Sequence, residues 1–289
     1  MKLYKQILIL FCLFLSVNIK GQFIDGFYGQ INLAIELTNE NKIDSAIIIY
    51  ESAFDKINYV HTKFLEKVVK LAKLNKDQER VSRYEKQIKK QIKGTNPELI
   101  KILDSLDVED QKVRSEKFSR AYSYYLKCNK DVSCYKKSKK YIRSKLLVDR
   151  WSKVDSLNIY HLLNLFKEYG FIGEELVGSK SSHNVILLLI HFDKDTNNSV
   201  LEPILKKAIN EGKVLPLHAA QFIDRHLFNH NGTQKYWTWN WNSKGKKFPF
   251  SESDLPKIIE LRESIGIYGS ELWQEKKGEY WVIRNKYNY

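Results

Sequence analysis

The sequence predicts a mainly α-helical protein, in which N-terminal helical-repeat hairpins precede a helical domain with a small β-hairpin near residues 236–250. Three observations lead to this prediction. Residues 27–93 have apolar residues at helical spacing and contain no proline. Further helical patterns follow between residues 99 and 228, whereas residues 236–242 alternate as a strand does. A hydrophobic share of 43%, with 13% aromatic residues, suffices for packed cores and argues against a disordered chain.

The N-terminal residues 1–21 have the features of a secretory signal. Lys2 and Lys5 supply positive charge, residues 7–15 are apolar, and Gly21 is a small residue at a plausible cleavage point. The apolar run is shorter than the ~20 residues of a membrane-spanning helix, which disfavours the alternative of an uncleaved anchor. We therefore expect an exported protein, located in the periplasm or outside the cell after cleavage near Gly21.

The chain is basic, with 48 Lys and Arg against 34 Asp and Glu, a formal net charge of +14. Cleavage after residue 21 would remove three lysines and no acid, leaving +14 − 3 = +11. This charge favours anionic surfaces of the cell envelope, and export makes nucleic acid an unexpected partner. The basic residues cluster at 86–93 and 127–145. We interpret both clusters first as solvated helix faces and second as anion-binding surfaces, because no glycine-rich phosphate loop accompanies them.

Two cysteines follow the predicted signal, Cys128 and Cys134. In an oxidising compartment such a pair can form a disulfide that closes a short loop. Two free thiols on a lysine-rich surface are the alternative, because spacing alone does not determine the geometry. No metal site is expected here, since no histidine lies nearby in the sequence.

Residues 27–94 resemble tetratricopeptide repeats, whose period is ~34 residues. In the first unit, the second helix carries the small, aromatic and small residues of that motif: Ala46, Tyr50 and Ala53. The second unit, 61–94, departs from it, with Arg80 and Gln87 where small residues are expected. We assign residues 22–95 to this first domain. Such repeats imply a surface that binds a protein partner or, alternatively, a structural cap on the next domain.

The second domain is predicted to span residues 96–289, beginning at the helix break Asn96-Pro97. Several short motifs run through it: Asp110-Gln111-x-x-Arg114, Asp155-x-x-Asn158, Gly170 followed by Val177-Gly178, His191-x-Asp193, Asp224-Arg225, Gly232-x-Gln234-x-Tyr236 and Leu261-Arg262-x-x-Ile265-Gly266. The order of these motifs over roughly residues 100–268 resembles the motif order of an uncharacterised bacterial family, domain of unknown function 6624. The resemblance implies a mostly helical domain and supplies no activity. The continuation Trp237-Thr238-Trp239 departs from the family pattern.

The charged residues of these motifs have two interpretations. In the first, a buried polar network joins the helices through Asp110, Gln111, Arg114, Asp155, Asn158, Asp224 and Arg225. Asp110 and Arg114 are four residues apart, so they share a helix face and can pair. In the second, His191 is a general base of a hydrolase-like site lined by Asp224 and Arg225. We favour the network, and whether the protein is an enzyme stays open.

Metal and cofactor sites are not expected. His226 and His230 share a helix face, but the pair lacks the Glu of a His-Glu-x-x-His zinc site. The run Asp193-x-Asp195-x-Asn197 begins like a calcium loop, yet its twelfth position is not acidic.

Aromatic residues near the C-terminus form a separate pattern. On a strand, Trp237, Trp239 and Trp241 would share one face, either packing against a helix or stacking on sugar rings. We favour packing. Residues 279–284 are interpreted as a further short strand or as a tail.

Taken together, these features favour an exported, non-enzymatic interaction or scaffold protein of the bacterial envelope, which binds a protein partner through its helical repeats. A hydrolase-like enzyme and a glycan-binding module are the alternatives.

Overall fold

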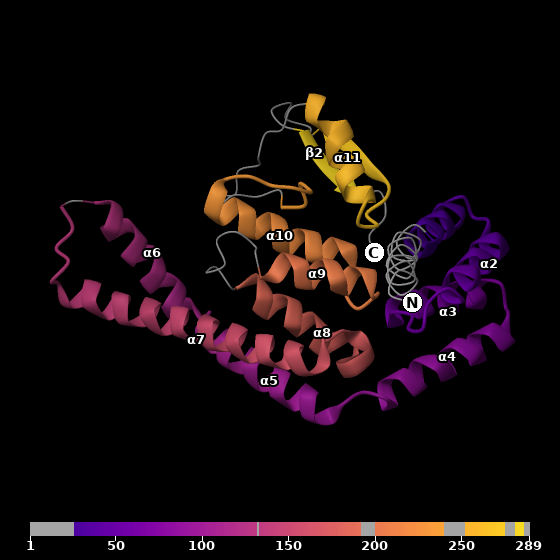
Figure 1. Ribbon diagram of the computed structural model, residues 1–289, viewed down its shortest axis with the longest axis horizontal. Coiled ribbons are helices and arrows are strands. Elements are labelled where there is room, and N and C mark those ends of the chain that lie inside the picture. The colour runs from indigo at the N-terminus through magenta and orange to yellow at the C-terminus, as the bar shows by residue number, and fades with distance from the viewer. Residues whose placement is uncertain (1–25, 132, 192–199, 240–251, 275–280, 286–289) are drawn as a thin grey trace, which may run out of the picture. The chain divides into compact units, whose positions relative to one another are not determined.

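The computed structural model describes residues 26–131, 133–191, 200–239, 252–274 and 281–285 (Figure 1). It confirms the prediction of a mainly α-helical fold. The chain divides into two compact units, one formed by Thr95–Asp195 and the other by Met1–Gly94 with Thr196–Tyr289. The predicted signal segment lies outside the described residues. Within the described residues, no helix has both the length and the apolar character needed to cross a membrane.

Residues 26–93 form two helical hairpins. The first pairs helix 26–39 with α2 (Ile43–Phe54), and the second pairs α3 (Thr62–Leu74) with α4 (Gln78–Lys93). Successive helices pack together, since α3 contacts both α2 and α4. The residues assigned to the repeat positions of α2 are all buried: Ala46, Tyr50 and Ala53. Small side chains there allow the close approach of neighbouring helices.

The turns of the two hairpins repeat the same hydrogen bonds 35 residues apart. Lys42 N donates to Leu37 O and Asn41 N to Thr38 O, and the same pair of bonds recurs at residues 76 and 77. These bonds form the Schellman motif, which ends a helix with one residue in the left-handed region. Asn41 (φ 59°) and Lys76 (φ 57°) are those residues. The first helix of each hairpin therefore ends in the same type of turn.

Arg80, which replaces a small residue of the repeat pattern, joins α4 to α2. Its guanidinium donates to both carboxylate oxygens of Glu51, Nε at 3.0 Å and Nη2 at 3.1 Å. Arg83 and the hydroxyl of Tyr84 also bind Glu51. Burial, with the nearby Glu51 charge, raises the pKa of Tyr84 to about 12. An ion-pair cluster thus occupies the place where small residues would pack.

The second unit contains α5 (Pro97–Lys112), α6 (Glu116–Lys130), α7 (Lys139–Tyr169) and α8 (Glu174–Ile190). Helices α6 and α7 run side by side, and α5 packs against α7 and α8 (Figure 1). The predicted break at Asn96-Pro97 is the start of α5, where Asn96 Oδ1 accepts from the N–H groups of Glu98 and Leu99. Gly170 (φ 71°) ends α7, and Gly178 (φ 76°) kinks α8, so both motif glycines have left-handed backbones.

After residue 195 the chain forms α9 (Leu201–Asn210), α10 (Pro216–Asn231), a 3-10 turn (Glu252–Asp254) and α11 (Leu255–Glu263). Helix α9 packs on α10. Strands β1 (Ser270–Gln274) and β2 (Trp281–Asn285) then pair antiparallel, with Leu272 opposite Ile283.

The β-hairpin predicted near 236–250 is not formed over its first residues. Residues 236–239 form no strand, because Trp237 has a φ of 51°, which is incompatible with extended alternation. The remaining residues, 240–250, lie outside the described residues. The sequence of residues 279–284 suits a short strand or a tail, and the described part of this segment is a strand.

Candidate functional site

A buried polar cluster in the second unit joins three of its helices. Arg114, which follows α5, forms an ion pair with Asp110, with 2.6 Å between Nη1 and Oδ1, and Nη1 donates to the backbone oxygen of Asp110 at 3.0 Å. Its Nη2 donates to Asp155 Oδ1 at 2.8 Å. His191 Nδ1, at the C-terminal end of α8, lies 3.2 Å from Asp110 Oδ1. Gln111 Nε2 donates to Asp110 Oδ2 at 3.1 Å. Four of the predicted network residues and the candidate base therefore meet around Asp110.

Burial determines the electrostatics of this cluster. Asp110 is 1% exposed, and two carboxylates share the one Arg114 guanidinium. Desolvation raises the pKa of Asp155, and the hydrogen bond and charge of Arg114 oppose that rise. The guanidinium also lies over the Trp151 ring, 5.4 Å from its centroid. This arrangement satisfies buried charges and links α5, α7 and α8, which is what a structural network does.

Asp155 and Asn158 lie inside α7, a helix of 31 residues. Asp155 faces Arg114, whereas the buried Asn158 Nδ2 has no hydrogen-bond partner within the described part of the chain. One turn of helix separates the two residues, so the Asp155-x-x-Asn158 motif places both on one face of α7.

Asp224 and Arg225 belong to the other compact unit and have different partners. Asp224, on α10, is fully buried. Its Oδ1 accepts from the N–H of Lys235 at 2.7 Å and of Tyr236 at 2.8 Å. Its Oδ2 accepts from Thr238 N at 2.6 Å and Thr238 Oγ1 at 2.7 Å. Burial raises the pKa of Asp224, and these four hydrogen bonds oppose the rise.

The segment held by Asp224 carries two of the predicted tryptophans. Trp239 N donates to Gln234 Oε1 at 3.0 Å, and Arg225 lies over the Trp239 ring, 5.4 Å from its centroid. Trp237 and Trp239 are each partly exposed. Because residues 236–239 are not a strand, the strand argument for a common tryptophan face does not apply to these two residues. Trp241 lies outside the described residues.

Arg262 is a site residue that sequence reasoning overlooked. It lies on α11, is 1% exposed and interacts electrostatically with Asp224. Burial lowers the pKa of Arg262 to about 10, and the Asp224 charge opposes this effect. The signal was present in the sequence, since Asp224 and Arg262 both belong to the family-like motifs. Their pairing in space could not be derived from spacing.

His226 and His230, two histidines of α10, have neighbouring rings tilted at 50° to each other. The ring centroids of His226 and His230 lie 4.5 Å apart, and His226 also stacks on Phe222 at 5.8 Å. Among the described residues, no group of three His, Cys, Asp or Glu side chains is placed to hold a metal ion. The calcium-like run 193–197 lies outside those residues.

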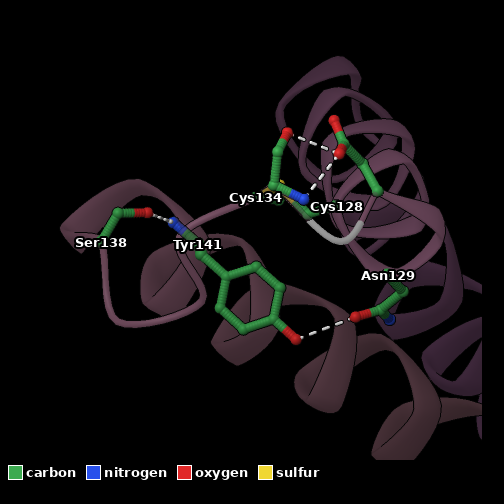
Figure 2. The surroundings of a disulfide bond; sticks show 7 residues. Cys128, Asn129, Cys134, Ser138 and Tyr141 are labelled. Carbon is green, nitrogen blue, oxygen red and sulfur yellow. Dashed lines mark hydrogen bonds between the residues drawn. A yellow bond between two sulfur atoms is a disulfide. The ribbon is translucent and has the colours of Figure 1, made fainter.

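Cys128, near the end of α6, is joined to Cys134 by a disulfide (Figure 2). The end of α6 is tied to α7, because Tyr141 donates its hydroxyl to Asn129 Oδ1 at 3.0 Å (Figure 2). The backbone N–H of Tyr141 donates to Ser138 Oγ at 3.2 Å, which caps the start of α7. The Tyr141 ring also stacks on Tyr125. The disulfide and these contacts together clamp the tip of the α6–α7 hairpin.

No family model, curated protein or solved structure matches this chain.

Proposed function

We propose that the chain is an exported, non-enzymatic scaffold or interaction protein of the bacterial envelope, which binds a protein partner through the helices of residues 26–93. The observation that carries this proposal is the repetition of the hairpin turn 35 residues apart. Stacked helical hairpins of this kind form extended surfaces that repeat proteins use for binding. The hairpins also expose large apolar side chains, including Leu33 (43% exposed) and Ile48 (57% exposed).

The buried polar residues support a structural role over a catalytic one. A catalytic group must reach the substrate, whereas Asp224 is fully buried and its carboxylate already accepts four hydrogen bonds. The Asp110 carboxylate is similarly enclosed: it forms an ion pair with Arg114 and accepts a hydrogen bond from Gln111. These contacts favour a framework for the helices, and the hydrolase alternative would have to rest on His191 with another set of partners.

Membership of the uncharacterised family 6624 is part of the proposal. The motifs that suggest it provide the members of two buried clusters. Asp110, Arg114 and Asp155 bind one another, and Asp224 interacts with Arg262. The Asp110–Arg114 pair follows from helical spacing, but Arg114 and Asp155 come from two motifs 41 residues apart, so their contact supports the resemblance.

Export also belongs to the proposal. The Cys128–Cys134 bond suits an oxidising compartment, and the N-terminal charge and apolar run suit a signal. Cell fractionation with an antibody against the chain tests this point. We expect a shortened protein outside the cytoplasm, and a full-length cytoplasmic protein would contradict export.

Affinity capture from a solubilised envelope fraction tests partner binding. The bait is compared with L33E/I48E, which places two charges on the repeat surface, and with I102E/L157E as matched control. Ile102 and Leu157 are likewise exposed apolar residues but lie on α5 and α7. We expect the unchanged bait and the I102E/L157E control to capture the same partner, and L33E/I48E to fail to capture it. Circular dichroism should show that both variants fold. Equal capture by both variants would contradict binding through the repeats.

A further inference from the structure

The tip of the α6–α7 hairpin carries the densest positive charge of the second unit. Residues 127–145 contain eight Lys and Arg and a single acid, Asp131. All eight basic residues are exposed. The carboxylate of Asp131 accepts from the N–H and hydroxyl groups of Ser133, at 2.9 Å and 2.6 Å. Little within the segment offsets the charge of its lysines.

The same hairpin exposes large apolar side chains beside these cations. Tyr135 is 68% exposed, Ile142 48% and Leu146 63%. Ile142 and Leu146 are four residues apart on α7, so they lie on one face of that helix. Exposed apolar residues are ordinary when scattered singly. A group of them among lysines is typical of surfaces that rest at a lipid interface, where the cations meet headgroups and the apolar groups enter the boundary.

The tip presents these groups from an ordered frame. The Cys128–Cys134 bond closes the loop, and the Tyr141–Asn129 hydrogen bond joins the end of α6, where that loop begins, to α7 (Figure 2). A cavity of about 530 Å³ opens at the tip and is lined in part by Tyr135, Lys136 and Lys137. Its lysine ammonium groups can donate to the phosphate of a lipid headgroup.

We infer that the tip of the α6–α7 hairpin binds the surface of an anionic lipid bilayer, with its lysines on the headgroup phosphates and Tyr135, Ile142 and Leu146 at the interface. The inference deepens the proposed envelope function and rests on it for access to a membrane. A nucleic acid would match the charge, but it offers no apolar boundary for the aliphatic side chains. The combination of charge and apolar groups therefore favours the bilayer.

Vesicle co-sedimentation tests the inference, using the chain from Gln22 onward so that the apolar residues 7–15 do not contribute. Vesicles of phosphatidylcholine with phosphatidylglycerol are compared with vesicles of phosphatidylcholine alone. We expect binding to the anionic vesicles, weakened by salt. K136Q/K137Q/K139Q/K140Q should lower the partition coefficient on the order of 1000-fold, since each lysine near such a surface contributes about fivefold. I142S/L146S should also lower it.

The matched control is K86Q/K89Q/K90Q/K93Q, which removes four exposed lysines from α4 and changes the net charge equally. We expect this control to bind nearly as the unchanged protein does. Equal loss in both lysine variants would overturn the inference, because net charge alone would then explain binding. Full competition by duplex DNA with no effect of I142S/L146S would overturn it in favour of a general polyanion site. Loss of partner capture by L33E/I48E concerns the repeats and leaves this test unaffected.

Discussion

Replacing Arg114 with methionine removes the guanidinium that two buried carboxylates share, while keeping most of the aliphatic side chain. Asp155 is partly exposed and can regain water, so the cost falls mainly on Asp110, which is 1% exposed. Removing one partner of a buried ion pair costs roughly 3–5 kcal/mol. Gln111 and His191 still face Asp110 in the variant. We therefore expect a loss near the lower end, about 3 kcal/mol in the free energy of unfolding.

A second substitution separates buried charge from lost packing. In D110N/R114M the uncompensated carboxylate is gone, so we expect recovery of about 2 kcal/mol relative to R114M. Urea unfolding followed by circular dichroism measures both values. Hydrogen exchange with mass spectrometry locates the change, which should appear in α5, α7 and α8 and leave α3 and α4 unaltered.

The control for this experiment is K145M, which breaks the exposed Lys145–Asp149 pair on α7. Exposed pairs at this spacing contribute little, so we expect a far smaller loss than in R114M. A loss below about 1 kcal/mol in R114M would refute the reasoning, because a buried carboxylate without its cation cannot be that inexpensive. The reasoning would also be refuted if D110N/R114M were no more stable than R114M.

Three further predictions concern other contacts. D224N should lower the free energy of unfolding by about 2 kcal/mol in urea titrations, because the NH2 group of the asparagine cannot accept the hydrogen bonds that Asp224 Oδ2 accepts from Thr238. An unchanged midpoint would contradict this. The raised pKa of Asp155 means that the folded protein binds this proton more tightly than the unfolded chain does. Its stabilising contribution is then present at low pH and is lost as pH rises from its ordinary pKa of 3.8 through the raised value, so the stability of wild type relative to D155N should fall over that window; a rise would contradict the sign. C128S/C134S should speed hydrogen exchange within 127–145 and little elsewhere, since the closed loop is short; unchanged exchange at the tip would show that the disulfide does not clamp it.

Local patterns predicted much of the helical framework. The Asn96-Pro97 break is a helix start, because a side-chain acceptor and a proline suit the first turn. Ala46, Tyr50 and Ala53 are buried as the repeat spacing requires. The Asp110–Arg114 pair also follows from helical periodicity alone. Each of these features depends on residues within one or two turns of each other.

Features that depend on contacts between residues far apart in the sequence could not be predicted from local patterns. The alternation at 236–239 suits a strand, yet Tyr236 and Thr238 donate their backbone N–H groups to the Asp224 carboxylate, which holds the segment in a different conformation. Trp237, between them, has a left-handed backbone. Tertiary hydrogen bonds override β-propensity there. Arg80 looked like a defect of the repeat, but Glu51 lies on the facing helix and pairs with it. No spacing rule predicts which acid will face which arginine.

The most direct test compares partner capture by L33E/I48E and by H191Q from the same envelope fraction. Glutamine at position 191 retains a side-chain donor toward Asp110 but cannot act as a general base. A scaffold that binds through its repeats should capture its partner fully as H191Q and lose it as L33E/I48E. Full capture by L33E/I48E with loss in H191Q would contradict the scaffold and place the functional centre at the histidine.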